Sequence, residues 1–213
     1  MKHITNCETL ICRRLSAEEL INIYAHTAIR HFPPAEYKPV ENVRKYLQND
    51  LYIGYGFFQQ NTLTAYALFL APAPNEFSSE TQSKPSKLLL DYFAVLEEYR
   101  NVSIGSAFLQ RLRKELTFAD GIYIESENPD EAADEKERTV RTKRIAFYDR
   151  NGAVYTGIRS TLFGVPYRIL YLPTAGNTVH GKDNYFAELD SIYHTMFPPK
   201  VYTEKVKLFP PVS

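Results

Sequence analysis

The segment from Leu88 to Leu116 constrains the fold more than any other part of the chain. Leu88 to Val95 is almost continuously apolar, which is typical of a strand buried on both faces. A short turn with small residues follows, and it leads directly into an amphipathic helix from Gly105 to Leu116. The first N–H groups of such a helix have no helical acceptor and lie at the positive end of the helix dipole. The pattern therefore predicts a strand–turn–helix with a site for a phosphate or pyrophosphate at the turn.

This turn resembles motif A of the GNAT acyltransferases, which has the pattern Arg/Gln-x-x-Gly-x-Gly/Ala and binds the pyrophosphate of acetyl-CoA. Here the pattern runs from Arg100 to Gly105 as Arg-Asn-Val-Ser-Ile-Gly. Ser103 stands where the family usually has glycine. Serine is small enough for a phosphate to approach, but it adopts a positive φ less cheaply than glycine. Taken alone, the turn would also suit an ordinary strand–turn–helix that packs through small residues.

A second segment, about 40 residues further along, resembles the later helix and turn of the same family, Ala-x-x-Phe-Tyr-Glu-x-x-Gly-Phe. Phe147 to Gly152 is the part that matches, with the sequence FYDRNG. The family more often has alanine at the position of Arg144 and asparagine at that of Arg141. Two motifs in the expected order make the chain similar to the GNAT superfamily over roughly Glu8 to Leu172.

The resemblance implies an α/β fold with a GNAT-type mixed central sheet. This sheet would be mostly antiparallel, with one central parallel pair that splays apart, and helices would flank it. With 213 residues, we expect a single acyltransferase-like domain over 1–213, in which 174–213 form a helical and extended C-terminal appendage.

Local signals predict several elements directly. Ser16, with Glu19 three residues later, predicts a capping box at the start of a helix. Gln60-Asn61 joins two strands as a hairpin. We expect a loop over 72–86, a long helix from Asp130 to Arg150 that ends at Asn151-Gly152, and an extended surface segment over 197–213.

Composition narrows the classes of function. Lys and Arg total 25, as do Asp and Glu, so the net charge is zero, which argues against nucleic acid or an anionic membrane as the main partner. Cys7 and Cys12 are expected to be reduced thiols. No apolar run approaches the length of a membrane span, and no signal peptide is recognised. We expect a cytoplasmic protein that binds neither nucleic acid nor membrane, and an exposed terminal helix and strand could form a homodimer.

The resemblance implies that the turn and the end of its strand bind the coenzyme. The amides after Arg100 would hold the pyrophosphate, and backbone groups of Phe93 and Val95 would pair with the pantetheine arm. A surface cation is the alternative role for Arg100. The residues expected to bind the coenzyme are Phe93, Val95, Arg100, Asn101, Val102, Ser103, Ile104, Gly105 and Ser106.

Three residues are candidates for catalysis. The family commonly has a tyrosine at the position of Tyr148, close to the coenzyme sulfur, so we expect Tyr148 to be the general acid; a core aromatic residue is the alternative. Asp91 interrupts an apolar strand, where a carboxylate is costly unless it is paired or faces a cleft. Asp91 and Glu125 are the candidate bases, and Glu127 on the same face is a weaker one. An ion pair for Asp91 and a solvated strand end for the glutamates are the alternatives.

Other polar residues favour structural roles. Arg141, Arg144 and Tyr148 share a helix face, and we expect the two arginines to form a solvated face that pairs with the acidic start of the helix. His26, His31 and His194 have no metal-ligand spacing, so we expect structural or surface roles and no metal site.

Together these features predict acetyl-CoA-dependent N-acyl transfer to a small amine by direct attack in a ternary complex, with acetyl-CoA as co-substrate. A coenzyme-A-binding or regulatory module without catalysis is the alternative. A nucleic-acid binder that uses the basic helix is a third hypothesis, against which the zero net charge argues. The acidic candidates weakly favour a cationic acceptor.

Overall fold

The computed structural model describes residues 10–32, 37–71, 86–178 and 184–211. The loop expected over 72–86 lies almost wholly outside these residues, and Cys7 lies outside them too. The chain divides into two compact units, Met1–Leu116 and Thr117–Ser213. The expectation of a single domain over 1–213 stays a prediction.

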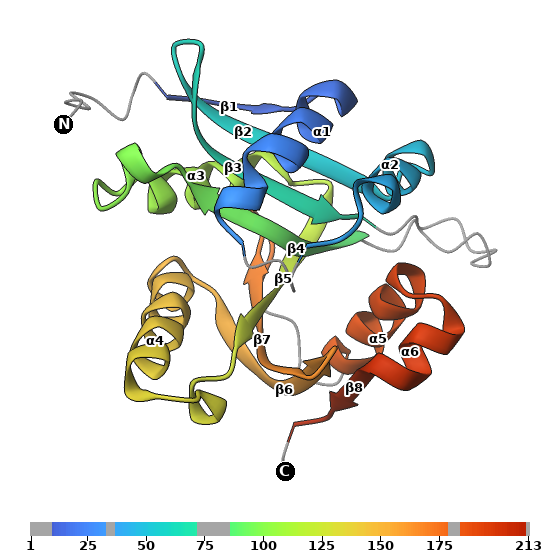
Figure 1. Cartoon of the computed structure of the whole chain (residues 1–213). Coiled ribbons are helices and arrows are strands. Elements are labelled where there is room, and N and C mark those ends of the chain that lie inside the picture. The colour runs from blue at the N-terminus through green and yellow to red at the C-terminus, as the bar shows by residue number, and fades with distance from the viewer. Residues whose placement is uncertain (1–9, 33–36, 72–85, 179–183, 212–213) are drawn as a thin grey trace. The chain divides into compact units, whose positions relative to one another are not determined.

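The first unit contains four strands and their flanking helices (Figure 1). In chain order these elements are β1 (Leu10–Arg14), α1 (Ala17–His26), the 3₁₀ helix η2 (Ala28–Arg30), α2 (Val40–Gln48), β2 (Tyr52–Gln59), β3 (Thr62–Leu70), β4 (Ser86–Val95), the 3₁₀ helix η4 (Glu97–Tyr99) and α3 (Ile104–Glu115).

The second unit also contains four strands and several helices. Its elements are β5 (Ala119–Glu127), the 3₁₀ helix η5 (Pro129–Glu131), α4 (Glu135–Arg150), β6 (Val154–Leu162), β7 (Val165–Pro173), α5 (Tyr185–Met196), α6 (Pro199–Lys205) and β8 (Val206–Phe209).

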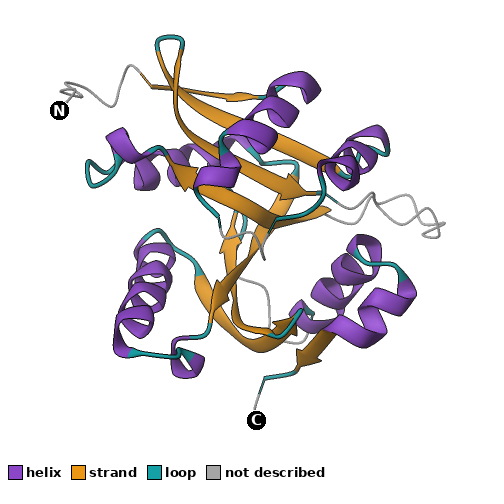
Figure 2. Ribbon diagram, viewed as in Figure 1, coloured by secondary structure: helices purple, strands orange, loops and turns teal. Residues whose placement is uncertain are grey.

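The strands of each unit are antiparallel to their neighbours, in the order β1-β2-β3-β4 in the first unit and β5-β7-β6-β8 in the second. The predicted fold class is confirmed: the protein is a mixed α/β protein whose strands are mostly antiparallel, with one parallel pair, and are flanked by helices (Figure 2). The splay expected at the parallel pair stays a prediction.

Helix α1 begins where the sequence predicts. The Ser16 hydroxyl accepts the Glu19 N–H at 3.1 Å, and the Glu19 carboxylate accepts the Ser16 N–H at 2.9 Å. This reciprocal pair is a capping box, which satisfies two N–H groups that the first helical turn leaves without acceptors. The inner face of α1 then buries Leu20, Ile23 and Tyr24.

Helices pack on both faces of the first sheet. Tyr92 and Phe93 are neighbours in β4, so their side chains project to opposite faces. The Tyr92 ring contacts Tyr24 of α1 edge-on, with 5.4 Å between ring centroids. The Phe93 ring stacks on Phe108 of α3 at 5.7 Å. Helices α1 and α3 therefore lie on opposite faces of β4.

The predicted hairpin is confirmed, and a bulge lies in the neighbouring strand. β2 and β3 are joined at Gln60-Asn61, where Gln60 has φ of 55°. In β4 the register shifts after Tyr92 pairs with Leu68, and Asp91 has no paired residue on β3. A bulge of this kind redirects a side chain, so the direction of the Asp91 carboxylate is set by an irregularity that the sequence does not reveal.

The predicted start of the long helix was wrong. The Asn128 side chain accepts the Asp130 N–H at 3.3 Å and opens the separate turn η5. Helix α4 begins only after Asp134, whose carboxylate accepts the Glu137 N–H at 2.7 Å. The acidic run contains several possible caps, and the structure uses two of them in succession. The predicted end is confirmed, with Gly152 at φ of 94°.

The prediction of an extended segment over 197–213 was wrong for Pro199–Lys205, which form a helix, whereas Val206–Phe209 are extended as a strand. Helix α6 begins at Pro199, and proline suits the first position of a helix because its missing N–H would have no helical acceptor there. β8 then pairs with β6, from Val206 opposite Leu162 to Phe209 opposite Arg159. The C-terminal region therefore contributes an edge strand to the second sheet.

Candidate active site

The turn between β4 and α3 is anchored at both ends. The Leu96 N–H donates to the Thr64 carbonyl at 2.9 Å and so extends the β3–β4 pairing by one residue. Tyr99 is buried, whereas Arg100 to Ser103 are exposed. Helix α3 is held against the sheet by Ile104 and Phe108, which are both fully buried. The exposed turn is thus carried on two rigid elements.

The backbone of this turn adopts a conformation that most residue types disfavour. Asn101 has φ of 62° and Ser103 has φ of 63°, so both are in the left-handed region. Asparagine tolerates this region, but for serine it costs roughly 1–2 kcal/mol. Ser103 occupies the glycine position of the motif, and the structure gives it the conformation for which glycine is suited. Strain of this kind is typical of functional sites.

The backbone donors of the turn are those of a helix N-terminus. The first helical hydrogen bond of α3 runs from the Ala107 N–H to the Ser103 carbonyl, at 3.0 Å. The N–H groups of Ile104 and Gly105 precede this bond, so the helix provides no acceptor for them. The Ser103 side chain makes no capping bond to them either. These donors and the helix dipole fit an anionic phosphate group.

Arg100 is turned toward the end of β4. Its Nε donates to the Val95 carbonyl at 3.1 Å. The guanidinium charge therefore lies beside the strand end, where the backbone of Phe93 and Val95 is expected to meet the coenzyme. Phe93 itself is fixed by its stacking on Phe108 of α3.

Asp91 is engaged by two partners. Its Oδ1 lies 2.5 Å from the Lys38 ammonium, and its Oδ2 accepts the Tyr52 hydroxyl at 2.5 Å. The Asp91 and Lys38 side chains are only 6% and 19% exposed, so this is a largely buried ion pair. This geometry fits the alternative role given above for Asp91, an ion pair, although the pair is buried rather than at the sheet surface.

Glu125 is also engaged. It accepts the Tyr193 hydroxyl of α5 at 2.5 Å, and that hydroxyl lies 3.3 Å from the Ser160 oxygen. Burial, together with the charge of Glu125, holds the pKa of Tyr193 well above its usual value. The same helix reaches Tyr123 of β5, whose hydroxyl donates to Glu188 at 2.5 Å. The Tyr123 and Glu125 side of β5 is therefore covered by α5.

Tyr148 lies near the end of α4 and is 7% exposed. Burial raises its pKa to about 12, and the nearby Arg144 charge acts in the opposite direction. Its carbonyl accepts the Asn151 N–H at 3.0 Å and the Ala153 N–H at 3.1 Å, which closes the helix. Because its pKa is about 12, the Tyr148 hydroxyl keeps its proton throughout the neutral range and is suited to donate a hydrogen bond.

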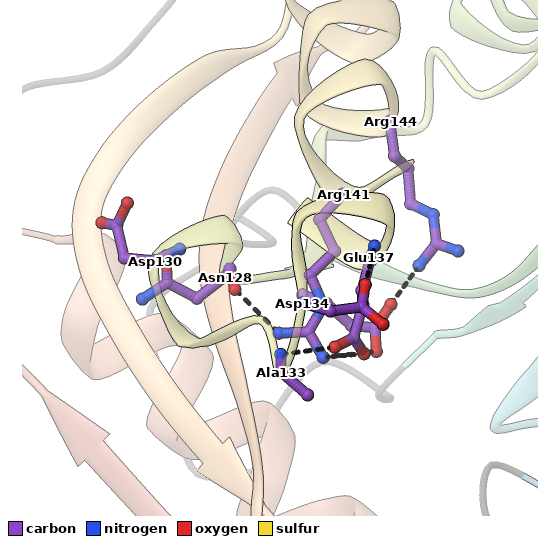
Figure 3. Close-up of polar contacts among 8 residues, drawn as sticks. Asn128, Asp130, Ala133, Asp134, Glu137, Arg141 and Arg144 are labelled. Carbon is purple, nitrogen blue, oxygen red and sulfur yellow. Dashed lines mark hydrogen bonds and ion pairs between the residues drawn. The ribbon is translucent and has the colours of Figure 1, made fainter. Parts of the chain in front are cut away.

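The arginines of α4 pair with carboxylates, as expected (Figure 3). Arg141 contacts Glu137 at 2.7 Å and Glu127 at 3.3 Å, and it donates to the Asn128 carbonyl at 2.8 Å. Arg144 contacts the other oxygen of Glu127 at 2.8 Å. The Arg141 side chain is only 7% exposed, so the expectation of a solvated face was wrong for this residue. The pairing joins the start of α4 to the end of β5.

One polar pair in the first unit was not expected from the sequence. His31 lies 3.0 Å from the Tyr66 hydroxyl through its Nδ1. Thirty-five residues separate the two, and no local pattern signals the contact.

Within the described ranges we find neither a cluster of metal ligands nor a cysteine that is ionised near neutral pH. No group of three or more His, Cys, Asp or Glu side chains there could hold a metal ion. Burial raises the pKa of the Cys12 thiol to about 12, so this cysteine is not a thiolate near neutral pH. None of the described helices combines the length and apolar character that a membrane crossing requires.

Several solved structures with a similar fold are described as acetyltransferases, some of them of the GNAT family. A candidate acetyltransferase of the GNAT family from Bacteroides thetaiotaomicron aligns with 91% of this chain and 97% of its own, with a TM-score of 0.62 and 16% identity. The ribosomal-protein-S18-alanine N-acetyltransferase of Escherichia coli aligns with 83% of this chain and 99% of its own, with a TM-score of 0.52 and 18% identity. The spermidine N-acetyltransferase of Vibrio cholerae, in complex with CoA and spermine, aligns with 79% of this chain and 97% of its own, with a TM-score of 0.52 and 12% identity.

These likenesses establish the fold: the chain has the GNAT fold, as its two motifs predict. No family model matches the sequence, and no curated protein does. The roles of the site residues stay predictions.

Proposed function

We propose that this protein is an acetyl-CoA-dependent N-acyltransferase that acts on a small amine by direct transfer in a ternary complex. The observation that carries the proposal is the turn before α3, where Ser103 has φ of 63° at the glycine position of the motif. The strained turn leads into the first turn of α3, where the helix itself gives the Ile104 and Gly105 N–H groups no acceptor, and Arg100 lies in the same turn. This donor set is suited to a pyrophosphate. A small-molecule acceptor, a cytoplasmic location and a homodimer stay part of the proposal.

Each part of the chain has a defined task in this proposal. When bound, the coenzyme supplies an activated acyl thioester. Arg100 and the amides from Asn101 to Ser106 hold its diphosphate, and the backbone of Phe93 and Val95 orients the arm that carries the thioester. Cys12 keeps its proton at neutral pH, which supports direct attack by the amine rather than transfer through this thiol.

Tyr148 is proposed to assist the departing sulfur. With a pKa of about 12 its hydroxyl is fully protonated at neutral pH. Complete proton transfer to a thiolate with an ordinary pKa of about 8.5 would cost about 5 kcal/mol. We therefore assign Tyr148 a hydrogen bond to the developing thiolate, which stabilises negative charge as it forms.

The carboxylates differ in what their contacts support. Asp91 already neutralises the buried Lys38, so its contacts favour a structural role. Glu125 is held by Tyr193 and stays a candidate base. A coenzyme-A-binding module without catalysis is the second candidate function, and the engagement of both predicted bases is the observation that favours it.

Calorimetric titration with CoA tests binding, and a matched pair of variants locates the site. Gly105→Asp places a carboxylate among the N–H donors and should weaken CoA binding at least about tenfold. Gln110→Asp adds the same charge on the exposed side of α3 and should change the affinity less than about twofold. A wild-type protein that does not bind CoA, or two variants with equal losses, would contradict the proposal.

Mass spectrometry with acetyl-CoA and a panel of amines separates the two candidate functions. An acylated amine supports the enzyme, whereas tight CoA binding without any acylated product supports the binding module. Tyr148→Phe should lower kcat by about 100-fold and leave the affinity for CoA within about threefold. Equal losses in kcat and affinity would exclude the proposed role of Tyr148.

A further inference from the structure

Transfer to an amine requires a proton acceptor, because an amine is largely an ammonium ion at neutral pH. The two carboxylates predicted for this task are engaged by other side chains. Asp91 is bound to Lys38 and Tyr52, and Glu125 is bound to Tyr193. We refer to the turn between β4 and α3 as the coenzyme turn. A proton acceptor near this turn is therefore to be sought among the other titratable groups of the first unit.

His31 and Tyr66 form a pair with suitable geometry. His31 Nδ1 lies 3.0 Å from the Tyr66 hydroxyl, and the two rings are nearly parallel, at 25°, with 5.9 Å between centroids. Tyr66 is fully buried in β3, so it holds the imidazole in one orientation. His31 itself follows η2 and is partly exposed. Its second ring nitrogen can therefore exchange protons with a ligand or with water.

The pair lies beside the coenzyme turn. Tyr66 is paired with Ala94 across β3 and β4, so their side chains share one face of the sheet. Ala94 stands between Phe93 and Val95, whose backbone is expected to hold the arm of the coenzyme. Arg100, bound to the Val95 carbonyl, is close enough for its charge to act on both His31 and Tyr66. All of these contacts lie within the first unit.

We propose that His31 is the proton acceptor for the attacking amine and that Tyr66 is the positioning residue that orients its imidazole. This inference rests on the proposed acyltransferase function and deepens it, because it assigns a residue that neither motif contains.

The electrostatic surroundings suit a base. Burial lowers the pKa of His31 below 6.5, and the positive charges of Arg100 and Arg30 lower it further. Glu98 and Glu97 act in the opposite direction but do not reverse the shift. Burial raises the pKa of Tyr66, so its hydroxyl stays neutral. The imidazole is therefore unprotonated at neutral pH and can accept a proton.

The proposed step balances in atoms and charge. In the tautomer that carries its proton on Nδ1, His31 donates to the Tyr66 oxygen, and its Nε2 takes a proton from the ammonium of the acceptor. The amine nitrogen then forms a C–N bond with the acyl carbon, and the C–S bond breaks. The second nitrogen proton goes to the departing sulfur, and His31 releases the first to water. One amide, one thiol and one proton are the products.

A titration by NMR tests the position of His31 without an acceptor. We expect the imidazole to titrate below pH 6.5 in the free protein. On addition of CoA its pKa should rise, because the diphosphate neutralises Arg100. Tyr66→Phe, which keeps the ring but removes the hydroxyl, should shift the titration of His31. A His31 pKa at or above 6.5, or one that does not change with CoA, overturns the inference.

Kinetics with acetyl-CoA and spermidine as the probe amine test the chemical role. The rate of the wild type should rise with pH below neutrality as His31 loses its proton. His31→Gln should abolish this rise, lower kcat/KM for the amine by about 100-fold and leave the KM for acetyl-CoA within about twofold. His26→Gln, an exposed histidine of α1, is the matched control and should behave as the wild type.

The outcomes separate this inference from the function on which it rests. A wild-type protein that binds no CoA ends both. A wild type that binds CoA and acylates spermidine, with a His31→Gln variant of equal rate and pH profile, ends only the role of His31.

Discussion

At the scale of single residues, the most informative position is Ser103. The sequence shows a serine in place of a glycine, and the structure places that serine at φ of 63°. In the proposed site, the backbone amides of this turn and Arg100 hold the diphosphate, and the side chain at position 103 takes no part. The side chain at 103 should therefore affect the stability of the fold far more than the affinity for the coenzyme.

We predict that Ser103→Gly is more stable than Ser103→Ala by about 1 kcal/mol, because alanine retains the Cβ that disfavours a positive φ. Urea unfolding of the two variants measures the difference. Both variants should bind CoA within about twofold of the wild type, since their amides are unchanged. An alanine variant as stable as the glycine variant would show that the turn does not hold this conformation in solution.

Residues that meet across long stretches of chain could not be predicted. Lys38 binds Asp91 across 53 positions, and His31 meets Tyr66 across 35. The sequence shows that Asp91 needs a partner, because a lone carboxylate in an apolar strand is costly. It does not show which cation provides one, since that depends on the bulge in β4. The strand, turn and helix of the candidate coenzyme site could be predicted because all three are local in the chain.

At the scale of elements, local chemistry explains which boundaries were predicted correctly. Helix α1 has one suitable cap, Ser16, with Glu19 at the matching position, and the start of this helix was predicted. The acidic stretch before α4 has several suitable caps. Asn128 caps the separate turn η5, and its side chain also accepts a hydrogen bond from Arg168 at 2.9 Å across 40 positions, which favours a turn there before α4 begins at Asp134. The start of this helix therefore depended on a contact that its own sequence does not contain.

Helix α4 contains a buried arginine, Arg141, whose side chain is only 7% exposed. Arg141→Met should destabilise the protein by about 3 kcal/mol, because the Glu127 oxygen that Arg141 binds then loses its partner in a largely buried site. Arg138→Met removes an arginine from the same helix, but its pair with Glu135 is exposed, with 48% of the arginine side chain accessible. That control should cost less than about 1 kcal/mol. Equal losses in urea unfolding would contradict a structural role for the buried pair.

At the scale of the whole molecule, tyrosine dominates the response to alkaline pH. The chain has 16 tyrosines, and each unit buries at least one with a raised pKa. Burial raises the pKa of Tyr24 to about 12 in the first unit and that of Tyr148 to about 12 in the second. An unfolded tyrosine ionises near pH 10. Between these values the unfolded chain loses protons that the folded chain keeps.

The sign of the effect follows from that difference. Below pH of about 10 both states are protonated, and the stabilisation by these neutral tyrosines is fully present. As the pH rises from about 10 to about 12, the free energy of unfolding should fall by up to about 2.7 kcal/mol for each such tyrosine. Urea unfolding over this range measures the fall. Tyr148→Phe should reduce it, because phenylalanine cannot ionise, whereas Tyr155→Phe, at a position 48% exposed, should leave it unchanged. An equal effect of the two variants would mean that Tyr148 is not protected from solvent in the folded protein.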